Sequence, residues 1–217
     1  FNPTWLAIVM LLTAAALPVR TQASTPSIVI SEIAWAGSSI SSSDEWIELT
    51  NVSDAALDLS GWTLKGAGSS GKDLVLPEAS MIEPQTTYLI TNYEHAHANT
   101  ALATEPDFVT ATLSVSNDGF DISLFDAGGI LIDRAGGTGA PFAGGSGSTG
   151  SSADGRYRSM VRVDGLGDGT LVQSWTDADT SQGFIDGVED YGTPGIVLFG
   201  SMTMEQETVE PVAEETG

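Results

Sequence analysis

Four aspartates in the C-terminal third of the chain have the residue type and spacing that most readily suggest chemistry. Asp164 and Asp168 flank a Gly-Leu-Gly segment, and Asp177 and Asp179 stand two positions apart. Hard cations such as Ca²⁺ take about six to eight oxygen ligands, which closely spaced loop aspartates can supply. We favour a solvated acidic loop and assign no cofactor. The alternative hypothesis is a calcium site with Asp164, Asp168, Asp177 and Asp179 as its ligands.

The two histidines of the chain lie close together in Glu94-His95-Ala96-His97. Side chains at i and i+2 of an extended segment point the same way, so two imidazoles could share a metal ion. The surrounding residues are polar and typical of a surface loop, and no helix is predicted that could carry an H-E-x-x-H zinc motif. No G-x-S-x-G turn is followed by a helix either. We assign no catalytic residue and expect that the chain is not an enzyme.

The charge of the chain limits its possible partners. It has 217 residues with 7 Lys+Arg against 29 Asp+Glu, which gives a formal net charge of −22 at pH 7. Such a surface repels nucleic acids, whose phosphates are neutralised by clustered Lys and Arg. Because the chain has no cysteine, thiol nucleophiles, thiolate metal sites and disulfides are excluded. We expect a protein or a surface polymer as partner, and no nucleic acid.

The two ends of the sequence differ in composition from its middle. Residues 5–17 are uncharged and mostly apolar, and Pro18-Val-Arg20 and Thr21-Gln-Ala23 follow, with the small Ala23 at the expected cleavage site. This pattern predicts a secretory signal peptide over residues 1–23, and we expect its basic start to precede Phe1. The apolar run is short for a membrane span, so we expect none in the mature chain, which would be secreted or at the cell surface. The acidic residues 200–217 lack aromatic side chains and predict a linker or tail.

Residues 24–199 predict a single all-β domain. Apolar residues mostly recur at every second position, in short runs separated by Gly, Ser, Asn, Asp or Pro. This period indicates strands, and many short strands indicate a sandwich or barrel. Residues 136–155 contain 12 Gly or Ser in 20 positions, so they predict a flexible loop within the domain. The predicted strands cover residues 28–35, 45–50, 57–64, 74–76, 87–91, 108–115, 120–125, 130–133, 157–163 and 196–199.

Tryptophans are expected to anchor the core of this domain. The segment 57–64, Leu-Asp-Leu-Ser-Gly-Trp-Thr-Leu, predicts a central strand with an irregularity at Ser60-Gly61. We expect Trp62 to be buried against Trp46 or Ile47. Asp58 and Thr63 should be exposed on the opposite face.

Three sequence blocks resemble the opening of the lamin-tail domain family. They are Ile28-Val-Ile-Ser-Glu-Ile-Ala-Trp35, Asp44-Glu-Trp-Ile-Glu-Leu-Thr-Asn51 and Leu57-Asp-Leu-Ser-Gly-Trp-Thr-Leu64. Further matching segments lie at residues 82–90, 113–126, 158–162 and 192–195. The resemblance implies an immunoglobulin-like β-sandwich, of the type found in bacterial secreted or surface proteins. It implies no general catalytic residues.

Two functions remain open at this point. The first is a non-catalytic module, secreted or at the cell surface, for protein interaction, adhesion or domain display. The alternative is an accessory domain of a larger extracellular hydrolase of the nuclease or phosphatase type, whose catalytic part would lie beyond Gly217.

Overall fold

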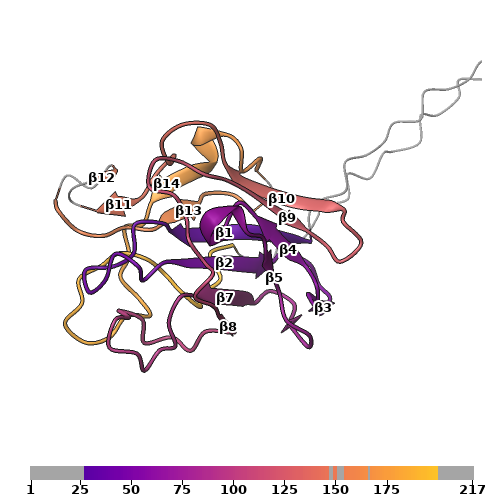
Figure 1. The fold of residues 1–217 in the computed structure, drawn as a ribbon, viewed down its shortest axis with the longest axis horizontal. Coiled ribbons are helices and arrows are strands. Elements are labelled where there is room, and N and C mark those ends of the chain that lie inside the picture. Colours follow the sequence, from indigo (N-terminus) through magenta and orange to yellow (C-terminus); the bar gives the residue numbers. More distant parts are fainter. Residues whose placement is uncertain (1–26, 147–148, 151–153, 166, 200–217) are drawn as a thin grey trace, which may run out of the picture.

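The computed structural model describes residues 27–146, 149–150, 154–165 and 167–199. The predicted signal peptide and the acidic segment 200–217 lie outside these residues. Two β-sheets enclose a hydrophobic core, and the helical elements of the described residues are two short 3-10 turns (Figure 1). No helix in this described part is long and apolar enough to cross a membrane. The expected all-β sandwich is confirmed.

The larger sheet has six strands in the order β14-β13-β1-β2-β7-β8, and the smaller has four in the order β10-β9-β4-β5. Neighbouring strands are antiparallel, apart from β7 and β8, which run parallel. Two further pairs, β3-β6 and β11-β12, form small sheets. The strands are β1 (Ile28–Ala34), β2 (Trp46–Asn51), β3 (Leu57–Asp58), β4 (Thr63–Lys65), β5 (Leu74–Val75), β6 (Met81–Ile82), β7 (Thr87–Thr91), β8 (Phe108–Val109), β9 (Asp121–Phe125), β10 (Leu131–Gly136), β11 (Gly145–Ser146), β12 (Thr149–Gly150), β13 (Met160–Arg162) and β14 (Trp175–Asp177), and the 3-10 turns are η1 (Ser69–Gly71) and η2 (Val172–Ser174).

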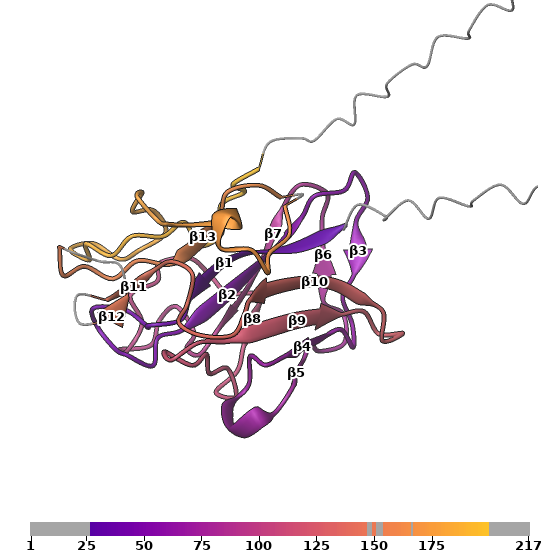
Figure 2. The ribbon, with the colours of Figure 1, turned by 90° about the horizontal axis from the view of Figure 1, so that it is seen from above.

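The outer face of the larger sheet is covered by loops. Trp46 and Leu89 pack there with Leu102, and Phe184 packs against this cluster. In Figure 2 the C-terminal segment, in orange and yellow, runs on the opposite side of β1 from β9 and β10. Because both faces of the sheet are covered, every residue of β1 and β2 is buried, and the polar ones among them must find partners inside the protein.

The predicted single strand over residues 57–64 is wrong. Its first part, β3, pairs with β6, whereas β4 pairs with β5 and β9 of the smaller sheet. The chain turns between them at Gly61, whose φ of +73° lies in the left-handed region that suits glycine. The alternating pattern over residues 57–64 therefore belongs to a segment that packs on the core but passes from one sheet to another.

The side chains around this turn follow the prediction in part. Trp62 is 8 % exposed and belongs to the central core cluster, as does Ile47. Trp46 instead lies in the cluster on the outer face of the larger sheet. Asp58 is exposed as predicted, whereas Thr63 is half-buried because it lies in β4 between its neighbours β5 and β9.

Three other predicted segments differ from the structure. The strand expected over 108–115 ends at Val109, because the chain turns at Thr110, whose carbonyl accepts the N–H of Leu113. The Gly/Ser-rich segment 136–155 contains the hairpin strands β11 and β12 in its described part. Residues 196–199 form no strand, although Phe199 is buried. In the first and third of these segments, buried apolar residues such as Leu113, Val115 and Phe199 lie outside the strands, so their pattern reports burial without strand formation.

Candidate functional site

A cavity of about 300 Å³ lies at the start of β2. Its walls come from the residues before β2, from η1, from the residues directly after β7 and from the segment that follows β8. Most of the lining residues are polar, and three of them are serines. The polar residues that line the cavity are Ser43, Glu45, Ser69, Asn92, Tyr93 and Ser114.

Glu45 is the acidic residue of this cavity. It is 8 % exposed, and its Oε2 accepts a hydrogen bond of 3.1 Å from the backbone N–H of Val115. Burial, which disfavours the charged form, raises the pKa of the Glu45 carboxyl to about 7, although the hydrogen bond from Val115 acts in the opposite direction. Glu45 therefore changes its charge near neutral pH.

The wall next to Glu45 is fixed by backbone and amide hydrogen bonds. The backbone N–H of Asn92 donates to the carbonyl of Glu45 (3.2 Å), and its side-chain Nδ2 donates to the carbonyl of Leu113 (2.8 Å). Asn92 Oδ1 is buried and accepts no hydrogen bond from the described residues. The Tyr93 ring stacks on His97, with centroids 4.5 Å apart and planes at 3°. The cavity thus offers acceptors and an aromatic ring.

Replacing Glu45 with glutamine should change how stability depends on pH. A carboxyl whose pKa is raised from 4.5 to about 7 in the folded state contributes stability below pH 4.5, which is lost as the pH rises through 7. Relative to Glu45→Gln, the wild-type free energy of unfolding should fall by about 3 kcal/mol between pH 4 and pH 8. Urea titrations at both pH values measure this difference. Parallel profiles for the two proteins would show that Glu45 does not titrate in this way.

Two other buried glutamates hold the C-terminal segment on the larger sheet. Glu32 of β1 and Glu48 of β2 are neighbours in register. Glu32 accepts hydrogen bonds from the Ser159 hydroxyl and from the N–H and hydroxyl of Thr193, and Glu48 accepts the N–H of Gly195. Burial and the nearby Glu32 carboxylate raise the pKa of Glu48 well above its usual value. The hydrogen bonds of these two carboxyl groups therefore stabilise the packing of the C-terminal segment on the larger sheet.

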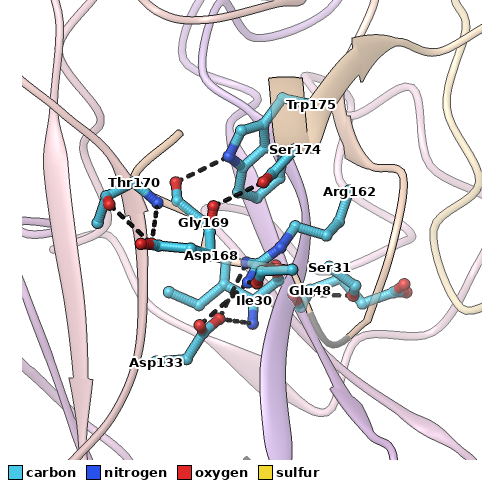
Figure 3. Close-up of polar contacts among 11 residues, drawn as sticks. Ile30, Ser31, Glu48, Asp133, Arg162, Asp168, Gly169, Thr170, Ser174 and Trp175 are labelled. Atoms are coloured by element: carbon cyan, nitrogen blue, oxygen red, sulfur yellow. Dashed lines mark hydrogen bonds and ion pairs between the residues drawn. The ribbon is translucent and has the colours of Figure 1, made fainter. Parts of the chain in front are cut away.

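A buried ion pair replaces a missing strand neighbour of β1. The strand β13 pairs with β1 at Glu32 and Ile33. At Ile30, two side chains form hydrogen bonds with the backbone of β1 in place of a neighbouring strand (Figure 3). The N–H of Ile30 donates to Asp133 (2.8 Å), and its carbonyl accepts from Arg162 (3.2 Å). Arg162 and Asp133 form an ion pair of 3.1 Å with side-chain exposures of 0 % and 8 %. The pair joins the two sheets, because Asp133 belongs to β10 and Arg162 to β13.

The loop after β13, which carries two of the predicted calcium ligands, is folded around Arg162. The carbonyls of Gly167, Asp168 and Gly169 each accept a hydrogen bond from a side chain of the fold. Hydrogen bonds from Thr170 to the Asp168 carboxylate lower the pKa of Asp168 (Figure 3). These oxygens are already engaged, and the nearby Arg162 guanidinium disfavours a cation.

The structure separates the four predicted calcium ligands into two places. Asp164 and Asp168 are exposed on the loop after β13. Asp177 and Asp179 line a second cavity of about 130 Å³, and Asp177 also accepts the N–H of Gly144. Within the described residues, no group of three or more His, Asp or Glu side chains is placed to hold a metal ion. Calcium binding by these aspartates stays a prediction.

The remaining candidates from the sequence have structural partners. His95 forms an ion pair with Glu105, and His97 stacks on Tyr93, so the two imidazoles have different neighbours. All four tryptophans of the described residues are buried, as expected. They are Trp35, Trp46, Trp62 and Trp175.

Sequence reasoning missed Glu45, although a signal was present. The block Asp44-Glu-Trp-Ile-Glu-Leu contains acids inside a predicted strand whose other residues are apolar. An acid in such a position must be buried with a partner or line a cavity. The same signal marks Glu32 in the apolar strand β1.

Comparisons with known proteins place most of these strands in one family. A sequence model described as Lamin Tail Domain matches residues 21–139, which include β1 to β10. No curated protein matches the chain. The larger sheet continues beyond the matched residues, because β13 and β14 follow at residues 160–177.

Proposed function

This chain belongs to the lamin tail domain family, which comprises non-catalytic immunoglobulin-like domains, and from this premise we propose that it is a non-catalytic interaction and display module acting outside the cell. It would be secreted or carried at a bacterial surface, and its partner would be a protein or a surface polymer. The apolar run at residues 5–17 supports export.

The observation that carries this proposal is that the most deeply buried ionisable side chains hold parts of the fold together. Glu32 and Glu48 bind the C-terminal segment, and Arg162 binds Asp133 and the β1 backbone. These groups connect segments of the sandwich that are far apart in the sequence. Enzymes instead direct such groups at a cavity, where their shifted pKa values serve acid–base chemistry.

Glu45 is the residue that could argue for an enzyme, because a cavity carboxyl that titrates near neutral pH resembles a general acid or base. Among the described residues, its side chain makes no hydrogen bond to a serine hydroxyl or an imidazole that could act as nucleophile or second catalyst. A lone carboxyl of this kind supports binding better than bond cleavage.

Hydrolysis assays test whether this chain is itself catalytic. The purified chain should release no product above background from double-stranded DNA or an aryl phosphate, with Mg²⁺ or Ca²⁺ present. Glu45→Gln, measured in parallel, identifies activity that depends on the cavity. Turnover by the wild type that Glu45→Gln abolishes would contradict a non-catalytic module.

Export is tested separately through the mature N-terminus. Expressed in a secreting bacterium, the protein should be recovered outside the cytoplasm and begin at Ser24 after cleavage behind Ala23. Mass spectrometry of the intact protein measures this. A cytoplasmic protein that retains residues 1–23 would argue against the proposed location.

A further inference from the structure

The carboxyl group of the Glu45 cavity is without a basic partner in the described part of the chain. The ion pairs of the structure involve other acids, and the pKa of Glu45 responds to burial and to the Val115 N–H with no contribution from a cation. A desolvated carboxylate gains most from a charged donor, because such hydrogen bonds are about twice as strong as neutral ones.

The other polar groups of the cavity also suit a donor. Serine hydroxyls can accept further hydrogen bonds, and an aromatic face such as that of Tyr93 attracts cations. An anionic ligand would meet both this carboxyl and a chain of net charge −22.

The hydrogen bonding of Glu45 distinguishes between two kinds of cation. A guanidinium binds best when both carboxylate oxygens are free to accept its parallel N–H groups. One oxygen of Glu45, Oε2, already accepts the N–H of Val115. An ammonium group needs a single carboxylate oxygen and can direct its other N–H groups to neighbouring acceptors.

We propose that this cavity binds a primary ammonium group on an alkyl chain, such as a lysine side chain of a partner or a free alkylamine. The volume of about 300 Å³ admits the ammonium group together with its alkyl stem. The site lies apart from the aspartates of the C-terminal loops. The proposed binding is independent of whether the chain is an enzyme, because equilibrium binding is measured without turnover.

NMR titration of the whole chain with small probes tests the site, and the Val115 amide bound to Glu45 is the reporter. Nα-acetyl-lysine N-methylamide should shift this resonance saturably. The Nε-acetylated and arginine analogues should bind at least about tenfold more weakly, because the first lacks the charge and the second the matching geometry. Arginine binding as tight as lysine binding, or no saturation with either, would overturn the proposal.

A parallel titration with n-butylamine identifies the source of the ammonium group. Tighter binding of the blocked lysine would support a side chain of a protein partner. Binding of n-butylamine that is equal or tighter would support a free alkylamine. Glucose as a neutral probe should give no shift, and saturable glucose binding in place of amine binding would count against the proposed chemistry.

Matched variants locate the binding to Glu45. Glu45→Gln keeps an acceptor for the Val115 N–H, so the fold should be retained, as its melting curve will show. It should weaken lysine binding at least about tenfold, whereas Glu78→Gln, which removes the same charge from an exposed position, should leave binding unchanged. Equal losses of lysine affinity in both variants would show only general attraction of the cation by the acidic surface, and would refute a specific site.

The pH dependence of wild-type binding provides a test that needs no variant. With a carboxyl pKa of about 7, lysine binding should weaken about tenfold from pH 8 to pH 6 as protons compete. The other titratable groups on the segments that line the cavity are Asp44, which precedes Glu45, Tyr93, His97, which stacks on Tyr93, and, beyond η1, Lys72. They are the same in Glu45→Gln, so any pH dependence left in that variant belongs to them. Wild-type binding that does not change with pH would contradict the role of Glu45.

Discussion

Replacing Arg162 with methionine is expected to lower the free energy of unfolding by about 3–5 kcal/mol. The methionine fills much of the space but leaves the Asp133 carboxylate buried, 8 % exposed, with no cation beside it. It also removes the donor to the Ile30 carbonyl and to the Gly167 carbonyl, so the edge of β1 and the loop after β13 lose their connection. Urea denaturation at pH 7 measures the loss.

The Arg134–Asp121 pair supplies a matched control on the protein surface. Both partners are more than 40 % exposed, so Arg134→Met should cost less than about 1 kcal/mol. A second variant, Arg162→Met with Asp133→Leu, removes the unpaired charge and should recover part of the loss. Similar small effects of Arg162→Met and Arg134→Met would show that the buried pair does not join the sheets.

Truncating Trp62 to alanine should destabilise the domain by about 3–5 kcal/mol. The indole is 8 % exposed and packs in the central core cluster, directly after the Gly61 turn that carries the chain from β3 to β4. Its removal leaves a large cavity, and the chain has no disulfide to limit the loss. Small domains have total stabilities of about 5–15 kcal/mol, so the variant should be marginally folded.

Asp58→Asn is the control for this region, because Asp58 is exposed on β3 and an asparagine can still accept the N–H of Ser60. Its melting temperature should equal that of the wild type. If Trp62→Ala also melted like the wild type, the tryptophan would not be a core residue. An exposed ligand platform would then become the better interpretation of its position.

Much of the fold follows from local sequence patterns. Short, largely apolar runs located β1, β2 and β7, which are buried on both faces, and alternating apolar residues located β9, whose burial also alternates. The same pattern failed at 57–64 because it reports burial and does not report which sheet a strand joins. There the left-handed φ of Gly61 decides the path, and the Ser60-Gly61 irregularity was its visible sign.

The polar sites were harder to predict because their partners are far apart in the chain. Asp133 and Arg162 are separated by 29 positions and meet at an edge of β1. Conversely, Asp168 and Asp177 are near in sequence but lie in different surroundings, one on the loop after β13 and one at the second cavity. Short sequence spacing within loops therefore does not show that acidic side chains lie close together in the fold.

The closure of β1 by C-terminal residues has a consequence for the kinetics of folding. Arg162 bonds to Ile30 across 132 positions, and Thr193 bonds to Glu32 across 161 positions. A ribosome that adds about 5–20 residues per second needs about 8–30 s to synthesise the longer of these intervals. Throughout this time the first strand has an open edge and unpaired acidic groups, so the nascent chain cannot complete its core. Contacts of such long range also place folding in the slow class, at milliseconds to seconds after release.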